Sequence, residues 1–445
     1  MEHENGLTAA LVERALRLRH DDLPADVRLV ARDCLTDWLG CTFAGLHEPA
    51  SSIVAEAVIE EGSAPRATLI GRGARGGLPQ AALVNGTASH ALDYDDVNLA
   101  LPGHLGVAII PALLALAEQR GASAADFVAA FTAGYETACR IGALVEPAHY
   151  ANGFHATATI GGLGAAVACA HLLKLSVTQA CSALGVAATQ AAGLKSMFGT
   201  MAKPLHAGLA AQAGLRSALL AHKGFVSRGD VLECAHGFAR VHGADFRVRD
   251  ALAEPPGGYH LLNNLFKFHA ACFSTHSTIE AAAALRREHR LQAGEVSRIH
   301  VLAGDGCVIC NIQSPATALE AKFSLRATAA FALLGIDTAR LDSWERVTEE
   351  RVRAVVDRVQ VELVPGMSLS ESVVTLDTLD GRSLRRAIDC GTPLSDKAGQ
   401  SARVTAKFLA ITSPVIGEER CRRILDRLNA FERGADIAAL LRECR

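Results

Sequence analysis

Apolar residues recur at helical spacing through most of the first 255 residues of the chain. In residues 24–45 they fall on one side of a predicted helix that ends near Gly45. Residues 158–175 and 177–194 are small and apolar nearly all round, which predicts helices that are buried on every side. We therefore expect the first half of the protein to be a bundle of helices.

Two helix boundaries in this region carry their own sequence signals. Ser123 is followed three residues later by Asp126, which resembles a capping box with Asp in place of Glu. Residues 204–224 begin with Pro204 and end with Gly224, the pair of residues that favour the first position and the end of a helix.

The pattern changes after the Pro/Gly break "EPPGGYH" at 254–260. Residues 277–289 predict a helix, whereas residues 296–303, 357–364 and 372–389 alternate like strands. The third of these reads as a hairpin with Asp380-Gly381 at its turn. After about residue 395 the helical pattern returns.

The predicted fold class is therefore mostly α, with a large all-helical domain and a smaller α+β lid domain. We place the helical domain at 1–260, the α+β domain at 261–395 and a C-terminal segment that returns to the helical domain at 396–445.

Composition and charge exclude several classes of partner. The net charge is −3, with both signs spread along the chain, so neither nucleic acid nor an anionic membrane is expected as a main partner. The most apolar windows, such as residues 107–118, are too short to span a bilayer. No basic region followed by an apolar stretch opens the sequence, and the 12 cysteines are scattered. We expect a cytoplasmic protein with reduced thiols.

The stretch "ASHALDYDDVN" at 88–98 places Asp93, Asp95 and Asp96 close together, and His104 follows in "LPGHLG". If the preceding helix continued, Asp93 and Asp96 would share a face, whereas in a turn all three acids would converge. A metal site, proton transfer and simple helix termination all stay open at this point. A magnesium site would lack nearby Asn or Glu partners.

A second polar group surrounds the start of the helix at 204–224. Lys203 directly precedes Pro204, and His206 follows within the first turn. A lysine beside the free N–H groups and positive end of a helix predicts a pocket for carboxylate or phosphate. His155 stands just before another apolar helix, where a histidine is either a local hydrogen-bonding residue or faces a cleft.

The stretch "KFHAACFSTH" at 267–276 is rich in possible metal ligands, but its spacing matches no structural zinc pattern well. Cys307 and Cys310 form a single CxxC, which with a third cysteine would suit an iron–sulfur cluster, a less favoured alternative. No GxGxxG, GxxxxGK[ST], HExxH or GxSxG motif supports dinucleotide, nucleotide, zinc-peptidase or serine-hydrolase chemistry.

Taken together, "NGTASHALDYDDVN", "GFHATATIGGLGAA", "GTMAKPLHAGLAAQAGLRSALLA" and the stretch at 267–276 resemble the MmgE/PrpD family in order and spacing. This family includes 2-methylcitrate dehydratase, cis-aconitate decarboxylase and iminodisuccinate epimerase. The resemblance implies a helical domain completed by the C-terminal helix, an α+β lid domain, a homodimer, and chemistry without a metal or organic cofactor.

The resemblance also implies which residues carry the chemistry. The predicted catalytic residues are Asp93, His104, His155 and Lys203. The predicted substrate-binding residues are Asp96, His206, Lys267 and Cys272.

The implied activity is that of a lyase or isomerase that transfers a proton at the carbon next to a carboxylate of a small di- or tricarboxylate. Members similar to cis-aconitate decarboxylase have a threonine after the acidic run and a tyrosine near Ile309 or Cys310, and here the first position is Val97. A hydro-lyase like 2-methylcitrate dehydratase is therefore expected first. An iminodisuccinate-type epimerase is the alternative, cis-aconitate decarboxylase is less favoured, and a non-catalytic binding protein on the same fold is the rival from another class.

Overall fold

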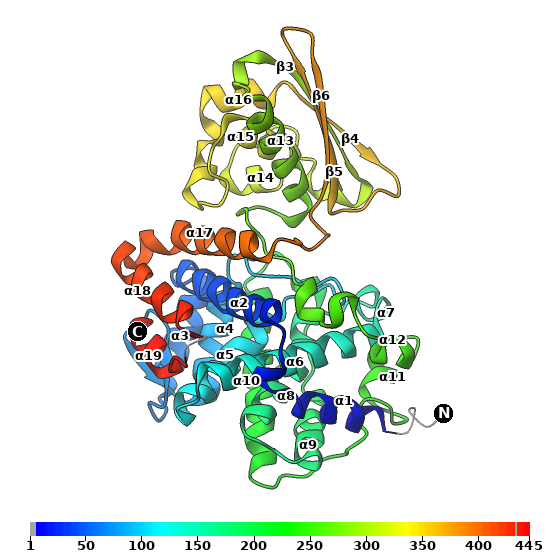
Figure 1. The fold of residues 1–445 in the computed structure, drawn as a ribbon, viewed down its shortest axis with the longest axis vertical. Coiled ribbons are helices and arrows are strands. Elements are labelled where there is room, and N and C mark those ends of the chain that lie inside the picture. The colour runs from blue at the N-terminus through cyan, green and yellow to red at the C-terminus, as the bar shows by residue number, and fades with distance from the viewer. Residues whose placement is uncertain (1–5, 432–433) are drawn as a thin grey trace. The chain divides into compact units, whose positions relative to one another are not determined.

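A computed structural model describes residues 6–431 and 434–445 of the chain (Figure 1). The chain forms two compact units. The first comprises residues 1–266 and 395–445, and the second comprises residues 267–394. Each is considered by itself.

The first unit is built from helices, with one short hairpin of β1 (Ala67–Leu69) and β2 (Ala74–Gly76). Its helices are α1 (Leu7–Leu16), α2 (Ala25–Ala44), α3 (Pro49–Glu61), α4 (Leu78–His90), α5 (Gly106–Arg120), α6 (Ala124–Val145), α7 (Ala148–Ala151), α8 (Ala156–Leu172), α9 (Val177–Ala188), α10 (Ala202–His222), α11 (Phe238–His242), α12 (Val248–Leu252), α17 (Lys397–Ile416), α18 (Glu418–Asn429) and α19 (Ile437–Glu443).

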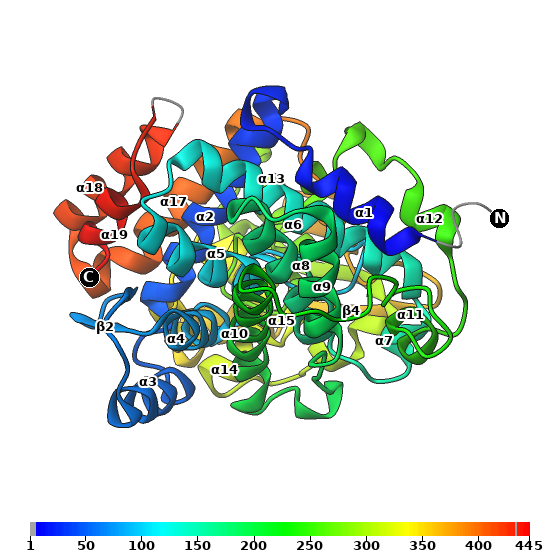
Figure 2. The same cartoon turned by 90° about the horizontal axis from the view of Figure 1, so that it is seen from below.

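Helix α8 is the centre of this unit. It packs against α5, α6, α9 and α10, as the view in Figure 2 shows, and its residues are buried from Ala156 to Ala170. The helix is apolar all round because it has a neighbour on every side. Its small residues let those neighbours approach closely. A Cβ on Gly134 of α6, for example, would lie 2.4 Å from the carbonyl oxygen of Gly164.

The C-terminal segment belongs to the helical unit. Helix α17 packs along α2, and α18 and α19 follow it. The carboxylate of Asp396 caps the start of α17 by accepting the N–H of Gly399. The end of the chain thus covers a helix formed near its beginning.

The second unit is an α+β structure around a four-stranded sheet in the order β4-β3-β5-β6. Strand β3 pairs in parallel with β4 and antiparallel with β5. Its strands are β3 (Val296–Gly304), β4 (Val359–Val364), β5 (Glu371–Thr378) and β6 (Ser383–Asp389), and its helices are α13 (His276–His289), α14 (Ala318–Lys322), α15 (Leu325–Leu334) and α16 (Glu350–Val356). Helix α13 packs against β5, β6 and α15.

Most of the predicted elements are confirmed. Helix α2 ends at Ala44 with Gly45 as its C-cap, Ser123 and Asp126 form the predicted capping box, and β5 and β6 pair as a hairpin around Asp380-Gly381. Two boundaries are wrong. The helix predicted over 177–194 ends at Ala188. Helix α10 begins at Ala202, so Pro204 is its third residue rather than its first.

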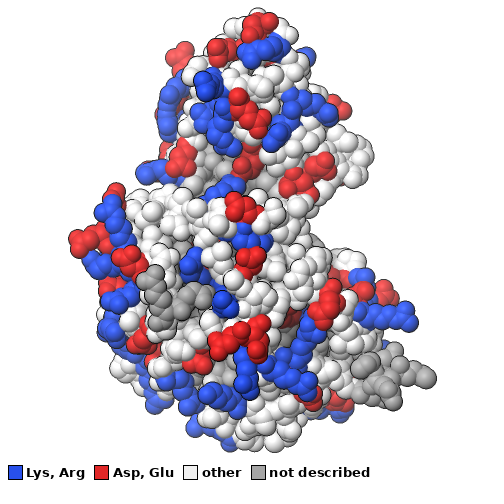
Figure 3. All heavy atoms as spheres, in the orientation of Figure 1, with Lys and Arg blue, Asp and Glu red and all other residues white. Residues whose placement is uncertain are grey.

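None of the helices among the described residues is long and apolar enough to cross a membrane. On the face shown in Figure 3, basic and acidic side chains are interspersed over each unit. This distribution matches the near-balanced net charge of −3.

Candidate active site

The acidic stretch lies in a turn and not in a helix. Helix α4 ends at His90, and Asp93 adopts a φ of 50°, in the left-handed region that Asp and Asn enter more readily than most residues. The chain then straightens, and Val97 pairs with Leu265 through two backbone hydrogen bonds of 2.8 Å. Of the two arrangements left open by the sequence, the turn is the one observed, but the three acids do not all converge, because the side chain of Asp96 lies against Cys34.

Two glycines set where this turn lies. A Cβ on Gly86 of α4 would lie 2.9 Å from the Cα of Gly208, and a Cβ on Gly208 of α10 would lie 2.3 Å from the carbonyl oxygen of Leu83. The two helices therefore cross backbone against backbone. Because Gly86 is one turn before the end of α4 and Gly208 lies near the start of α10, this crossing brings the acidic turn to Lys203.

Two nitrogen groups converge on one carboxylate oxygen at this point. Lys203 Nζ lies 2.8 Å from Asp93 Oδ1, and His104 Nε2 lies 3.5 Å from the same atom. The side chain of Asp93 is 49% exposed, whereas those of Lys203 and His104 are 15% and 12% exposed. Lys203 and His104 are thus largely desolvated, which strengthens their electrostatic interactions, whereas Asp93 stays open to a small molecule.

Behind this group, a buried carboxylate fixes two imidazoles. His104 Nδ1 donates to the carbonyl oxygen of Asp96 at 2.8 Å and lies 2.8 Å from Asp95 Oδ2, and His90 Nδ1 lies 2.8 Å from Asp95 Oδ1. Burial alone would raise the pKa of Asp95, but His90 and His104 outweigh it and hold this pKa well below its usual range. With Nδ1 of His104 occupied, Nε2 is the atom that can exchange a proton beside Asp93.

The model of the MmgE/PrpD N-terminal domain matches residues 9–250, and that of the MmgE/PrpD C-terminal domain matches residues 269–430.

The chain belongs to the MmgE/PrpD family.

Among curated proteins, the chain is similar to a cis-aconitate decarboxylase-like protein of Aspergillus oryzae, at 28% identity over 98% of this chain and 97% of that one. It is similar to a cis-aconitate decarboxylase of Aspergillus terreus at 27% identity, over 98% of this chain and 96% of that one. The human cis-aconitate decarboxylase is 31% identical over 64% of this chain and 61% of its own length. The MmgE/PrpD relatives are thus lyases by name.

Two other histidines of this MmgE/PrpD protein are held neutral. Burial lowers the pKa of His90 to about 4 and that of His155 to about 2, with nearby Lys203 adding to the effect on both. His155 Nδ1 lies 3.1 Å from Nδ1 of His206, and its ring stands edge-on to Phe198. Neutral imidazoles orient by hydrogen bonding, so His155 suits a positioning role better than the acid or base role predicted for it.

Asp96 does not occupy the place predicted for a substrate-binding residue. Its side chain is 1% exposed and lies against Cys34, with Oδ2 4.0 Å from the thiol, and a Cβ on Gly106 would meet Oδ1 at 2.4 Å. Burial, together with Asp37 and Asp95, raises its pKa well above the usual range. Only its backbone carbonyl reaches the site, through His104.

The other predicted substrate-binding residues divide between the two units. His206, on α10, is half-buried beside His155. Lys267 and Cys272 belong to the second unit, where Cys272 packs against a cluster that contains Cys307 and Cys310. A hydrogen bond with Cys310 lowers the pKa of Cys272 to about 6. Their roles at the site stay predictions.

The ligand atoms of His90, Asp93, Asp95 and His104 lie within 4.8 Å of one another, a spacing that a metal ion could use. In this arrangement Asp95 engages both imidazoles and the ammonium of Lys203 lies on Asp93. A cation there would have to displace or face a lysine of the same charge. The donor set therefore fits an organic anion at Lys203 better than it fits a metal.

Sequence reasoning missed His90 and treated Asp95 as part of a turn. The signal was present, since His90 ends the helix that leads into the acidic run, five residues before Asp95. It also missed Lys407, whose Nζ donates to the carbonyl oxygen of Tyr94 at 2.6 Å and so holds the turn from α17. No local pattern marks that contact.

Proposed function

We propose that the protein is a cofactor-independent lyase that acts on a small di- or tricarboxylate by proton transfer at the carbon next to a carboxylate. The observation that carries this proposal is the convergence of Lys203 Nζ and His104 Nε2 on Asp93 Oδ1. A fixed cation stands beside a group that can exchange a proton, and both are needed when negative charge develops next to a carboxylate.

In this reaction Lys203 binds the carboxylate that flanks the reacting carbon. His104 Nε2 removes the proton from that carbon, and the electron pair moves into the carboxylate to give an enolate-like dianion. The ammonium of Lys203 stabilises this charge where it develops. The carbonyl oxygen of Asp96 accepts the Nδ1 proton of His104, and the buried carboxylate of Asp95, 2.8 Å from the same nitrogen, helps to keep the ring oriented and stabilises its protonated form during the transfer.

We place loss of water first, as in 2-methylcitrate dehydratase. After proton removal, the dianion expels the β-hydroxyl as a double bond forms, and His104, now protonated at Nε2, donates its proton to the departing oxygen. Val97 favours dehydration over decarboxylation, because members similar to cis-aconitate decarboxylase have a threonine at this position. In this chain Val97 is buried and pairs with Leu265.

The second candidate is decarboxylation of a cis-aconitate-like acid. The curated relatives that match nearly the whole chain carry that name or a name derived from it. Loss of CO2 leaves an electron pair on the same carbon, and a protonated Nε2 of His104 would donate the proton that completes the reaction. An iminodisuccinate-type epimerase would use the same proton transfer without loss of a group.

We further propose that the protein acts as a homodimer. The segment that leads into Lys203, together with the first turns of α10, exposes large apolar side chains to an unusual degree for a globular surface. They are Leu194 (52% exposed), Met197 (37%), Phe198 (38%), Met201 (55%) and Leu209 (45%). A second copy is the partner that we expect to cover them. Sedimentation of wild type and a Met201→Glu, Leu209→Glu variant tests this directly, and a monomeric wild type would contradict it.

The reaction itself is tested by NMR in D2O with 2-methylcitrate, cis-aconitate, iminodisuccinate and citrate. Vinyl signals with solvent deuterium in recovered substrate indicate dehydration, CO2 release indicates decarboxylation, and deuterium exchange with inversion alone indicates epimerisation. His104→Gln should abolish whichever activity is found, whereas His222→Gln, on an exposed histidine at the far end of α10, should keep it. Unchanged turnover in the His104 variant would overturn the proposal.

A further inference from the structure

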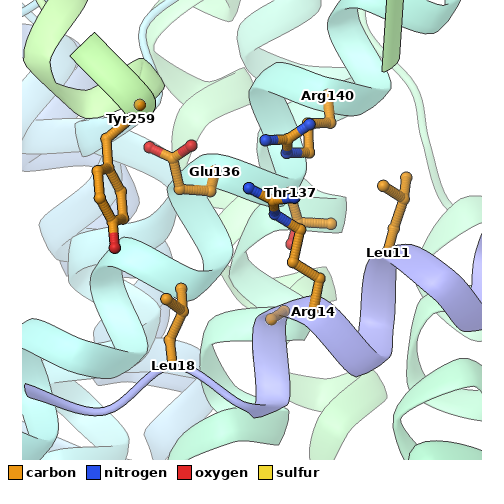
Figure 4. A pocket seen from close by; sticks show the side chains of 9 residues that line it. Leu11, Arg14, Leu18, Glu136, Thr137, Arg140 and Tyr259 are labelled. Atoms are coloured by element: carbon orange, nitrogen blue, oxygen red, sulfur yellow. The ribbon is translucent and has the colours of Figure 1, made fainter. Parts of the chain in front are cut away.

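The helical unit contains a polar pocket whose arginines are engaged with the backbone and with a carboxylate of the same unit (Figure 4). Arg140 Nη1 donates to the carbonyl oxygens of Ala251 and Ala253 at 3.0 and 2.9 Å. Arg14 pairs with Glu254 at 2.9 Å. Both arginines thus serve the fold. The second unit differs, because it holds a cluster of cysteines of unequal acidity.

The exposure of the cysteines singles out one of them. All 12 lie among the described residues, and three of them, Cys234, Cys272 and Cys390, are partly exposed. Of these three, Cys272 packs against a buried cluster that contains Cys307 and Cys310, both of which are 0% exposed. A partly exposed cysteine thus has two buried cysteines beside it.

One segment of the second unit holds both sides of this thiol cluster. The N–H of Cys272 donates to the carbonyl oxygen of Lys322, at the end of α14, at 3.0 Å. Two residues further on, Ser324 forms an antiparallel bridge with Asn311, which follows the 3₁₀-helix η7 (Asp305–Cys310). The contact between Cys272 and the end of η7 is therefore fixed by the backbone and belongs to the fold of this unit.

The thiols of Cys272 and Cys310 differ in charge. A hydrogen bond with Cys310 lowers the pKa of Cys272 to about 6, and Ser274 and Lys267 act in the same direction against the effect of burial. The hydrogen bond with Cys272 and burial raise the pKa of Cys310. Near neutral pH the pair is therefore a thiolate that accepts from a neutral thiol, and the thiolate is the form of cysteine that attacks oxidants.

Cys307 is engaged elsewhere. Its thiol donates to the carbonyl oxygen of Leu369 at 3.4 Å and lies 3.8 Å from that of Ser274. Burial raises its pKa. Cys310, which contacts the thiolate directly, is therefore the cysteine that can complete a disulfide with Cys272.

We propose that Cys272 is a modification site for hydroperoxides and that Cys310 converts its oxidised form into an intramolecular disulfide. With hydrogen peroxide, the thiolate of Cys272 attacks one oxygen. A sulfur–oxygen bond forms, the oxygen–oxygen bond breaks, and the leaving hydroxide takes up a proton to become water. The peroxide is reduced, and the sulfur of Cys272 is oxidised to a sulfenic acid.

The second step joins the two sulfurs. Once Cys272 is a neutral sulfenic acid, the negative charge that raised the pKa of Cys310 is gone, so Cys310 gives up its proton more readily. Its sulfur attacks that of Cys272, the disulfide forms, the sulfur–oxygen bond breaks, and the hydroxide leaves with the proton of Cys310 as water. One peroxide and two thiols thus give one disulfide and two waters.

The disulfide removes the charge of Cys272 and ties its stretch to η7, where Val308 and Ile309 are 63% and 62% exposed. Because Cys272 is also a predicted substrate-binding residue, any effect of the disulfide on turnover rests on the proposed function. The reaction of the thiols does not, so the test uses no substrate.

The test treats the reduced full-length protein with one equivalent of hydrogen peroxide at pH 7 and maps disulfides by the masses of tryptic peptides. Trypsin leaves Cys272 as the one cysteine of residues 268–286 and places Cys307 and Cys310 together in residues 299–322. In wild type these two peptides should be joined, and dithiothreitol should separate them.

Two variants identify the cysteine that completes the disulfide. In Cys310→Ser the link should be lost, and dimedone, which traps sulfenic acids, should label Cys272. In Cys307→Ser, a matched change at an equally buried cysteine, the link should form as in wild type. A link that persists in Cys310→Ser or is lost in Cys307→Ser would overturn the inference.

Cys234 and Cys390 are the internal controls, because they are partly exposed like Cys272. Both should stay reduced when one equivalent of peroxide has been consumed. Peptides that stay separate in peroxide-treated wild type, or oxidation of Cys234 or Cys390 in place of Cys272, would also contradict the assignment.

Discussion

The helical unit contains two lysine–aspartate pairs of nearly equal length and very different surroundings. Lys407 Nζ lies 2.6 Å from Asp37 Oδ1, and the two side chains are 2% and 0% exposed. Lys203 Nζ lies 2.8 Å from Asp93 Oδ1, with side chains that are 15% and 49% exposed. The same chemistry thus occurs once in the core and once at an opening.

The surroundings decide what each pair can do. Asp37 and the carbonyl oxygen of Tyr94 surround Lys407, so the buried pair fixes α17 against α2 and the turn at Tyr94. Asp93 Oδ1 receives Lys203 and His104 from one side while half of its side chain faces solvent. A substrate carboxylate can therefore reach the ammonium of Lys203, which no solute can do at Lys407 without unfolding.

The largest effect on turnover is expected at the open pair. Lys203→Met should lower kcat/KM by about 10³- to 10⁴-fold, because the cation that stabilises the developing charge is lost. Its effect on the free energy of unfolding should stay below about 1 kcal/mol, since partly exposed ion pairs contribute little. Steady-state kinetics and urea unfolding of the same preparation measure kcat/KM and the free energy of unfolding. A large loss of stability would mean that the Lys203–Asp93 pair, like the buried pair, is structural.

The buried pair should show the opposite result. Lys407→Met leaves Asp37 charged in the core and should lower the free energy of unfolding by about 3–5 kcal/mol. Removing both charges in Asp37→Leu, Lys407→Met should restore most of this loss, because the uncompensated charge is gone. Urea unfolding of the two variants tests this. If the double variant were as unstable as the single one, the uncompensated charge of Asp37 would not be the cause of the lost stability.

Asp95 is as buried as Asp37, yet it contacts His104 of the open site, so its replacement should affect both turnover and stability. Asp95→Asn should lower kcat by about 10²-fold, since His104 loses the carboxylate that orients it. The lowered pKa of Asp95 adds a stability test. Its contribution is complete above the ordinary carboxyl pKa of about 4 and is lost as pH falls below that value. Wild type and variant should thus differ in stability at pH 7 and converge toward pH 2.

His155 should produce a smaller, pH-dependent effect. Burial lowers its pKa to about 2, so below pH 6.5 the unfolded chain binds a proton at this residue that the folded protein does not. Stability is then lost on acidification, by about 1.4 kcal/mol per pH unit from this residue between pH 6 and pH 4. In His155→Gln this part of the slope should disappear, as chemical unfolding at a series of pH values would show. An unchanged slope would mean that His155 titrates normally.

Much of the fold could be predicted from local pattern. The small apolar residues of α8 indicate a central helix, and the alternation around Asp380-Gly381 indicates a hairpin, because burial on all sides and burial on one side leave different sequence periods. The prediction that α9 is buried on every side is wrong, since Thr178 is exposed and Val177 and Gln179 are only half-buried. Helix α10 begins two residues before its predicted first residue, Pro204, because a proline is tolerated anywhere in the first turn of a helix.

The candidate active site could likewise be predicted only in part. Asp93, His104 and Lys203 stand in recognisable motifs, and the structure brings them together. The buried role of Asp96 and the pairing of Asp95 with His90 depend on how α4 crosses α10 at Gly86 and Gly208, which no local pattern reports. The contact between Lys407 and Asp37 joins residues 370 positions apart and has no sequence signal at all.

The central claim is that Lys203 holds a substrate carboxylate. Calorimetric titration with tricarballylate, a saturated tricarboxylate that has neither a hydroxyl to lose nor a double bond, tests it without turnover. Wild type and Lys223→Met, which alters an exposed lysine at the other end of α10, should bind it equally, and Lys203→Met should bind it at least about 30-fold more weakly. Equal affinity in all three proteins would contradict the account.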